Sequence, residues 1–296
     1  MEKIILDTDI GSDVDDVLAL GVLLGSPEVT LLGLTTVYGD TVLRARLARR
    51  LARLARPDIA CPFIPGAGQP LSGRPVWWPG HEGALFPDLG LESVDDELDA
   101  PGFLAATAAA QPGQVTVLAI GPLTNVALAL GRYPAFAGQV KRVVVMGGDF
   151  GPGRVPEHNF VCDLTAARAV LESQLPLTVC GLDQTMRVVL GPDQLARIDA
   201  AGPFGRATAN EVRQYWAFDG RDRNQPHDAL TALVALVPAL FRLADRDLDL
   251  SDDGVAGDRP PTRRTAIVTD VMVDRAQTEM VDRIVRAAGR SVRLRA

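Results

Sequence analysis

Five aspartates fall within ten positions near the start of the chain: Asp7, Asp9, Asp13, Asp15 and Asp16. Carboxylates gathered so densely repel one another by about 4 kcal/mol per pair at 4 Å and an effective dielectric constant of 20. A bound cation would turn that repulsion into attraction. Several carboxylate oxygens suit a hard ion such as Ca²⁺ or Mg²⁺ better than zinc or copper. The first chemical prediction is therefore a divalent-cation site.

The elements that must position these aspartates can be read on either side of them. Residues 4–6 form an apolar run suited to a buried strand, and residues 17–20 begin a helix with an apolar face. An acidic pair at the start of a helix favours its macrodipole, which accounts for two of the five carboxylates. It does not account for Asp7 and Asp9, which follow the strand directly. Ligand sites in open parallel sheets lie at the carboxyl ends of the strands, where these two stand.

Strand-like and helix-like segments alternate along most of the chain. The further strand-like runs cover residues 29–38, 59–64, 115–120, 142–146 and 177–182. This alternation predicts an α/β fold with a mostly parallel central sheet flanked by helices, in an open, Rossmann-like arrangement. We find no internal repeat and no long low-complexity linker, so we expect a single domain over residues 1–296.

The C-terminal part differs in character from the rest. Short apolar runs between residues 248 and 273 are separated by Asp252-Asp253-Gly254 and Pro260-Pro261. They predict a small antiparallel addition near the C-terminus. Residues 274–288 then predict a closing helix.

The clearest helix covers residues 41–56, with leucines at 43, 47, 51 and 54 on one face. The opposite face carries six arginines: Arg44, Arg46, Arg49, Arg50, Arg53 and Arg56. Such a row could bind phosphate, but we interpret it as the solvated outer face of an amphipathic helix.

Composition excludes several classes of function. A net charge of −7 and a pI near 5.1 disfavour nucleic acid and anionic membranes as partners. No apolar run approaches the roughly 20 residues that span a bilayer. Three isolated cysteines give neither a disulfide framework nor a Cys-x-x-Cys metal site. The sequence starts directly in a strand, without a basic-then-apolar leader, so we expect a cytoplasmic protein.

The aspartate-rich segment also carries a resemblance to a known family. Asp-Thr-Asp-Ile-Gly (7–11) followed by Asp-Asp-Val-Leu-Ala-Leu (15–20) resembles the N-terminal signature of the inosine/uridine-preferring nucleoside hydrolases. That family binds Ca²⁺ and hydrolyses the N-glycosidic bonds of ribonucleosides. Its usual spacing is Asp-x-Gly-x-Asp-Asp, whereas Asp13-Val14 intervenes here. We align Asp15 and Asp16 with the family's pair and keep Asp13 as a rival for one of their roles.

The resemblance implies a metal shell and two catalytic groups. The Ca²⁺ ligands would be Asp9, Asp16, Asp228 and the main-chain carbonyl of Thr124, which sequence alone would place at a turn or helix start. Asp9 would deprotonate a water held by the metal. His227, next to Asp228 at the start of an apolar run, would protonate the leaving base. A reference pKa of about 6.5 suits histidine to that task.

The resemblance also implies a ribose site. Asp15, Glu157 and Asn159 match residues that hold the ribose hydroxyls, and His158 replaces an aromatic residue between the last two. Gly151-Pro152-Gly153 stands where many members carry an asparagine for the 5′-hydroxyl. We interpret Asp163 as an N-cap.

Four further residues are candidates for substrate binding, and each also has a purely structural interpretation. Asp40 either contacts the ribose or its water, or caps the helix that follows it. His81 either approaches the base or is a surface-loop histidine. Tyr215 and Trp216 either contact the base or belong to the core, as aromatics at helical spacing usually do.

The resemblance thus implies hydrolysis of a ribonucleoside to ribose and free base, through an oxocarbenium-like transition state as in glycoside hydrolysis generally. Family membership would further imply nucleoside salvage and a homodimer or homotetramer. One alternative is a metal-binding, hydrolase-like protein with lost or altered activity. A second is a phosphatase of the haloacid dehalogenase class, which also begins with Asp-x-Asp after a strand. A non-catalytic Ca²⁺ module is the third. The groups that contact the nucleobase lie in variable loops, so the sequence does not indicate which base is preferred.

Overall fold

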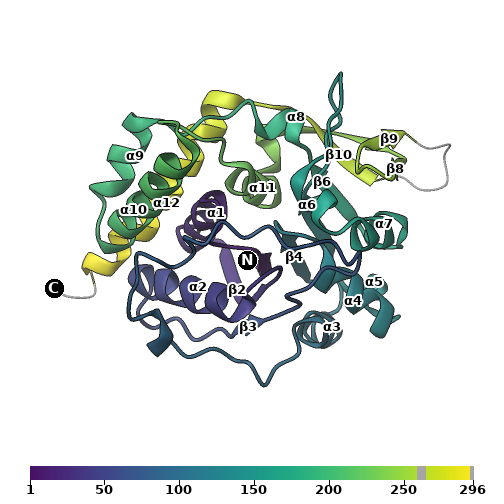
Figure 1. Cartoon of the computed structure of the whole chain (residues 1–296), viewed down its shortest axis with the longest axis horizontal. Helices are drawn as coiled ribbons and strands as arrows, with labels where there is room; N and C mark the ends of the chain where they lie inside the picture. Colours follow the sequence, from purple (N-terminus) through teal and green to yellow (C-terminus); the bar gives the residue numbers. More distant parts are fainter. Residues whose placement is uncertain (259–264, 294–296) are drawn as a thin grey trace.

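The computed structural model describes residues 1–258 and 265–293. In these parts of the chain an eight-stranded sheet has the order β3-β2-β1-β4-β5-β6-β10-β7 (Figure 1). All neighbouring strands are parallel except β7, which is antiparallel to β10. The bounds are β1 Glu2–Thr8, β2 Val29–Thr36, β3 Phe63–Pro65, β4 Val115–Ala119, β5 Arg142–Met146, β6 Leu177–Cys180, β7 Phe241–Arg246 and β10 Thr265–Val271.

A second, two-stranded antiparallel sheet pairs β8 (Leu248–Leu250) with β9 (Ala256–Asp258). The mostly parallel sheet and the small antiparallel addition near the C-terminus are therefore both confirmed. Pro260-Pro261, which marked the addition in the sequence, lies outside the described residues. The closing helix is confirmed as α12, Val273–Arg293.

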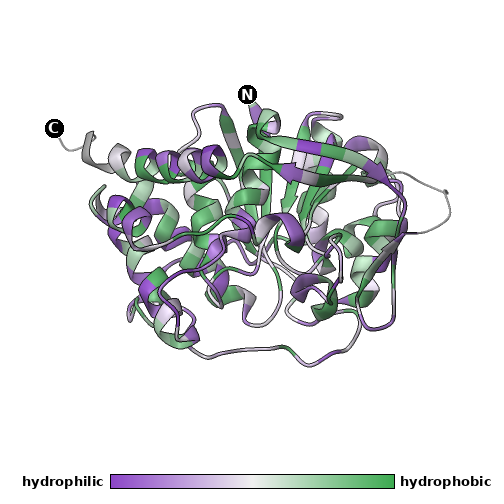
Figure 2. Ribbon diagram, turned by 90° about the horizontal axis from the view of Figure 1, so that it is seen from above, coloured by the Kyte–Doolittle hydropathy of each residue, from purple (hydrophilic) through white to green (hydrophobic). Residues whose placement is uncertain are grey.

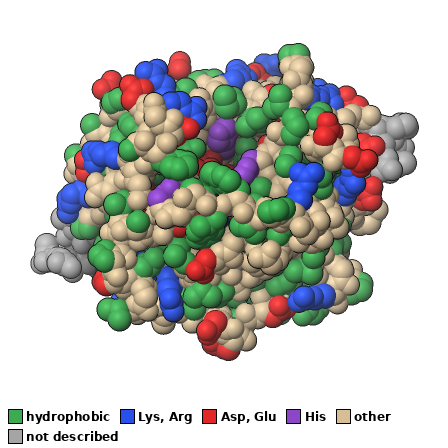
Figure 3. Space-filling view, in the orientation of Figure 1, with side chains coloured by type: hydrophobic (Ala, Val, Ile, Leu, Met, Phe, Trp, Pro, Cys, Tyr) green, Lys and Arg blue, Asp and Glu red, His purple; other side chains and the backbone are tan. Residues whose placement is uncertain are grey.

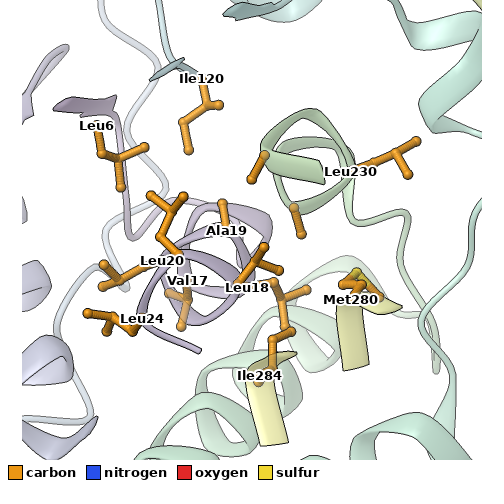
Figure 4. Close-up of a cluster of buried hydrophobic side chains, with 14 of the residues drawn as sticks. Leu6, Val17, Leu18, Ala19, Leu20, Leu24, Ile120, Leu230, Met280 and Ile284 are labelled. Carbon is orange, nitrogen blue, oxygen red and sulfur yellow. The ribbon is translucent and has the colours of Figure 1, made fainter. Parts of the chain in front are cut away.

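Helices cover both faces of the sheet, each through an apolar cluster. The larger cluster joins the sheet to α1 (Asp15–Leu24), α2 (Thr41–Ala55), α9 (Pro192–Asp199), α10 (Pro203–Asp219), α11 (His227–Leu236) and α12. Figure 4 shows its centre, where Leu18 of α1 lies near Ile284 of α12. The smaller cluster holds α3 (Ala100–Ala110), α4 (Thr124–Arg132), α5 (Phe136–Gln139) and α7 (Leu164–Glu172) on the other face.

The strands are apolar because both of their faces are covered. Residues 4–6 of β1 are fully buried, as are nearly all residues of β4 and β5. Figure 2 shows the same division: hydrophobic ribbon fills the middle of the molecule and hydrophilic ribbon its outer helices and loops. Continuous apolar runs of this kind are typical of parallel strands.

Two sequence predictions need correction. The strand predicted over residues 59–64 is only β3, Phe63–Pro65, because Pro62 offers no N–H to extend the ladder at this edge of the sheet. The six arginines between positions 44 and 56, five of them in α2, do not all face solvent, since Arg44 is completely buried while Arg53 is exposed. In the described residues no helix is long and apolar enough to cross a membrane.

Candidate active site

Loops at the carboxyl ends of the parallel strands converge on one cavity of about 280 Å³. The loop from β1 to α1 forms one wall, the segments after β4 and β5 form others, and the start of α11 closes it. We call this cavity the inner chamber. Six acidic residues line it: Asp9, Asp13, Asp15, Asp16, Glu157 and Asp228. Figure 3 shows the hollow from outside, with histidine side chains around acidic groups that lie deeper.

The chamber unites residues from the two ends of the chain. The backbone N–H of Asp228, in the first turn of α11, donates to a carboxylate oxygen of Asp15, 3.3 Å away and 213 positions earlier. Helices α1 and α11 pack side by side, so their acidic first turns face the same space (Figure 1). Asp9, Asp16 and Asp228, the three carboxylates predicted to hold the metal, all line this chamber.

The carboxylates are crowded and poorly compensated. Burial, and then the charges of neighbouring aspartates, raise the pKa of Asp15, Asp16 and Asp228 well above the ordinary value. Burial also raises the pKa of Asp9 to about 6, against the opposing charge of Arg44. One buried oxygen of Asp15, Oδ1, has no hydrogen-bond partner among the described residues. Ligand atoms of Asp13, Asp15 and Asp16 lie within 4.8 Å of one another.

This donor set fits a hard divalent cation. Only carboxylate oxygens converge, without a cysteine or histidine cluster in the described residues, and oxygen ligands are those of Ca²⁺ and Mg²⁺. The unpartnered Asp15 oxygen and the raised pKa values both indicate negative charge that lacks its counter-charge. Asp13, which the sequence left as a rival, belongs to the same cluster.

A buried arginine holds the β1–α1 loop in place. The guanidinium of Arg44 donates to the main-chain carbonyls of Asp9 and, at 2.8 Å, Ile10. It also donates to the hydroxyl of Ser12 at 2.9 Å and to the carbonyl of Tyr38 at 2.7 Å. Tyr38 has a left-handed backbone, φ 68°, an unusual conformation for a non-glycine residue. The loop that carries the aspartates is thus fixed from α2.

Asp7 has a supporting position beneath the chamber. Its carboxylate accepts hydrogen bonds from Thr35 (2.5 Å) and Asn125 (2.7 Å), and it is fully buried at the end of β1. Burial raises its pKa to about 7. Asp7 therefore ties β1 to β2 and α4 rather than lining the cavity.

Glu157 and Asn159 line the opposite wall. The carboxylate of Glu157 accepts from the N–H groups of Asn159 and Phe160, and thereby caps α6 (His158–Cys162). The amide nitrogen of Asn159 donates to the carbonyls of Ile120 (2.8 Å) and Met146 (3.3 Å). With its nitrogen engaged in this way, the Asn159 side chain has its oxygen left to offer.

His227 lines the inner chamber at the start of α11. Its Nδ1 lies 2.7 Å from the hydroxyl of Thr185, in α8 (Leu182–Thr185). Burial lowers the pKa of His227 to about 4, so its imidazole is neutral at neutral pH.

A larger and more open cavity, about 760 Å³, adjoins the first; we call it the outer chamber. Its lining is largely aromatic and apolar, with Tyr38, Trp77 and Tyr215 among its residues. Arg74 supplies a positive charge there. Asp13 and His158 line both chambers. A small acidic cavity that opens into a wide aromatic one suits a molecule with a polyhydroxylated part and a flat part.

Comparison with known proteins identifies the family. The family model described as inosine-uridine preferring nucleoside hydrolase matches residues 4–289. The chain belongs to this family. It is accordingly an N-ribosyl hydrolase that acts on ribonucleosides.

Curated relatives of this nucleoside hydrolase agree. The chain is 35% identical over 249 residues to the non-specific ribonucleoside hydrolase RihC of Salmonella agona, which covers 81% of this chain and 80% of the relative. It is 33% identical over 213 residues to the pyrimidine-specific ribonucleoside hydrolase RihB of Escherichia coli, covering 69% and 67%.

Solved structures show the same fold. A plant nucleoside hydrolase, PpNRh1, superposes with a TM-score of 0.84 at 25% identity, covering 96% of this chain and 99% of the plant enzyme. The purine-preferring ribonucleoside hydrolase from Gardnerella vaginalis also gives 0.84, at 23% identity, with 97% and 99% covered.

Four predicted residues of this nucleoside hydrolase lie outside the lining of both chambers. Thr124 is buried in the first turn of α4, where its hydroxyl donates to Asp163 at 2.7 Å. Asp40 is exposed and caps α2, accepting from the N–H of Leu43. Trp216 is in the core and donates to Asn224 at 2.8 Å.

His81 is the fourth. Its Nε2 lies 2.9 Å from the carbonyl of Ser12, and its ring packs on Phe218. It therefore supports the β1–α1 loop from outside. Asp163 caps α7 by accepting from Ala166, as predicted.

The sequence reasoning missed the roles of Arg44 and His158. For Arg44 a signal was present, because positions 44, 48, 51 and 55 form a second helical stripe whose other members are alanine or leucine. For His158 the signal was its place between the two ribose candidates. Only the structure shows that it borders both chambers.

Proposed function

We propose that the chain is a Ca²⁺-dependent hydrolase that splits a ribonucleoside into ribose and free base through an oxocarbenium-like transition state. The observation that carries the proposal is the junction of the two chambers. The inner one offers carboxylates and an amide to sugar hydroxyls, and the outer one offers aromatic faces to a base.

Asp9, Asp16 and Asp228 would hold the ion, and the family resemblance adds the carbonyl of Thr124, a residue that lines neither chamber. Asp13 stands as the rival for a place in that set, because its carboxylate is grouped with those of Asp15 and Asp16. When bound, Ca²⁺ neutralises the crowded carboxylates and increases the acidity of a nearby water.

The protein's own groups then divide the work. Asp9, whose pKa is raised to about 6, accepts the proton of the attacking water. Asp15, Glu157 and Asn159 orient the ribose, and an error of 1 Å there can cost about 10²-fold in rate. Tyr215 packs beside the base in the outer chamber. His227 lies on the sugar side, where the predicted role is to protonate the base.

Production of reducing sugar from a panel of ribonucleosides tests this function. Turnover should require Ca²⁺ after treatment with a chelator, and Asp9→Asn should reduce kcat by at least about 10²-fold with little change in the thermal midpoint. Near-normal turnover by Asp9→Asn, or full activity in excess chelator, would contradict the assignment.

The phosphatase alternative has a specific obstacle. Its nucleophile would be Asp7, which is fully buried and accepts hydrogen bonds from Thr35 and Asn125. Release of phosphate from a phosphomonoester would nevertheless support the phosphatase alternative. A homodimer or homotetramer, a cytoplasmic location and a single domain over residues 1–296 stay predictions.

A further inference from the structure

Only two residues of the described chain, Asp13 and His158, line both chambers. The inference that follows rests on the proposed function. If the sugar occupies the inner chamber and the base the outer one, the N-glycosidic bond crosses the boundary that these two side chains form. Of the two side chains, a protonated imidazole has an N–H to donate, whereas an ionised carboxylate can only accept.

The ring of His158 is held from two sides. Its Nε2 lies 3.5 Å from the sulfur of Cys162, one turn along α6. The ring also packs edge-on against Trp77, with ring centroids 5.6 Å apart. Nδ1 has no hydrogen-bond partner among the described residues. The arrangement fixes the ring and leaves one nitrogen for a ligand.

The charges around His158 favour its protonated form. Cys162 and Glu157 belong to or flank its own helix, while Asp9 and Asp13 face the boundary from the β1–α1 loop. On the other side, the outer chamber carries Arg74 and the hydroxyls of Tyr38 and Tyr215. The Cys162 sulfur, then Asp9 and Glu157, raise the pKa of His158 to about 10. A cation in the inner chamber would lower this value, because a nearby positive charge disfavours the protonated form.

His227 differs in both respects. His227 lines the inner chamber but not the outer one. Its Nδ1 lies within hydrogen-bonding distance of the Thr185 hydroxyl, and burial keeps the imidazole neutral. A neutral imidazole held in this way is suited to hydrogen bonding. It is a poor reservoir for the proton that the leaving base needs.

We propose that His158, in place of His227, is the residue that donates a proton to the departing base. As the bond from C1′ to the base nitrogen breaks, its electron pair moves onto the base, and the base takes the His158 proton. The oxygen of water bonds to C1′ and its proton passes to Asp9. Asp9 then releases its proton to solvent and His158 takes one up from solvent, so nucleoside and water give ribose and neutral base.

Leaving-group dependence tests this assignment. Uridine and inosine need a protonated leaving group, whereas p-nitrophenyl riboside does not, because p-nitrophenolate is already a stable anion. His158→Gln and His158→Phe should lower kcat/KM for the two nucleosides by at least about 10²-fold. The same variants should change p-nitrophenyl riboside hydrolysis by less than about fivefold. Val155→Gln, at an exposed position three residues away that lines neither chamber, is the matched control and should behave as wild type.

The possible outcomes distinguish a failure of the proposed function from a failure of the role of His158. A wild-type protein that cleaves none of the three substrates overturns the proposed function itself. A wild type that cleaves all three, with His158 variants equally impaired on all or on none, overturns the role of His158 alone. Thermal midpoints measured in parallel show whether a variant is folded. If His158→Gln were unstable, the same substrate comparison on His158→Phe decides the question.

The partner sulfur provides an independent readout. Cys162→Ala removes the group that most raises the pKa of His158. The alkaline limb of the kcat/KM profile for uridine should therefore move to lower pH, while the profile for p-nitrophenyl riboside stays in place. A shift of both profiles together, or of neither, contradicts the proposal.

Discussion

The guanidinium of Arg44 donates a hydrogen bond to the main-chain carbonyl of Asp9. Arg44 lies in α2 and Asp9 in the loop after β1, 35 positions apart, so the contact ties a neighbouring helix to the acidic loop. The positive charge also opposes the effect of burial on the Asp9 pKa. A single side chain thus holds the backbone of the proposed base in place and counteracts part of the rise in its pKa.

Replacing Arg44 by methionine should destabilise the protein strongly. Three buried carbonyl groups, of Asp9, Ile10 and Tyr38, would lose a charged donor, at a total cost of about 3–5 kcal/mol. Urea denaturation measures the loss. Arg53→Met on the same helix is the control, because its ion pair with Glu92 is exposed on the arginine side and should contribute at most about 1 kcal/mol. Equal losses for the two variants would refute the anchoring role.

Gly121→Ala should impair activity with little effect on folding. A Cβ at this position would lie 2.6 Å from Oδ1 of Asp9, so the carboxylate would have to move. We expect kcat to fall by at least about tenfold, given the sensitivity of catalysis to misplacement. Gly131→Ala, in α4 with open space around its Cβ, should leave kcat unchanged and add up to about 1 kcal/mol of stability. Wild-type kcat in Gly121→Ala would mean that the Asp9 position is not critical.

Stability of the metal-free protein should fall as the pH rises from about 5 to 7. The folded pKa of Asp9 is about 6, and those of Asp16 and Asp228 are also raised above the unfolded value of 3.8. Between the unfolded and folded values the native state binds more protons, so each such group lowers stability by up to about 1.4 kcal/mol per pH unit. His227, with its folded pKa lowered to about 4, acts in the opposite sense below its unfolded value of 6.5. Because three such carboxylates oppose one histidine, we expect the net stability to fall as the pH rises.

Urea denaturation of chelator-treated protein at the two pH values gives the slope. Saturating Ca²⁺ should largely remove it, because the cation supplies the missing counter-charge at both pH values. A metal-free protein that becomes more stable toward neutral pH, or a slope that Ca²⁺ does not change, would count against the carboxylate cluster as its origin.

Glu211→Gln should stabilise the protein in alkaline buffer. Glu211 is only 4% exposed, its Oε1 has no partner among the described residues, and burial raises its pKa to about 7. Its contribution to stability is therefore lost as the pH rises through that value, and glutamine removes the buried charge. We expect a gain of about 1–3 kcal/mol near pH 8.5 and almost none near pH 5. The exposed Glu97→Gln is the control, and a gain of equal size in both variants would exclude burial as the cause.

Much of the fold was accessible from local pattern. Buried parallel strands require continuous apolar runs, and residues 4–6, 115–119 and 142–146 have them. The five aspartates between positions 7 and 16 indicated a cation site through the chemistry of carboxylates, and the family resemblance added Asp228. Helix caps such as Asp40 and Asp163 were also predictable, because a cap acts on the backbone two or three residues away.

Tertiary structure decided the rest. The helical stripe of positions 44, 48, 51 and 55 places Arg44 among apolar residues, but only the packing against α2 shows that its partner is the loop of Asp9. The pKa values of His227 and His158 differ because one is buried beside Thr185 and the other lies beside Cys162 and the acidic chamber. Sequence determines which residues can ionise, while burial and the charges brought near them by folding determine which of them hold a proton.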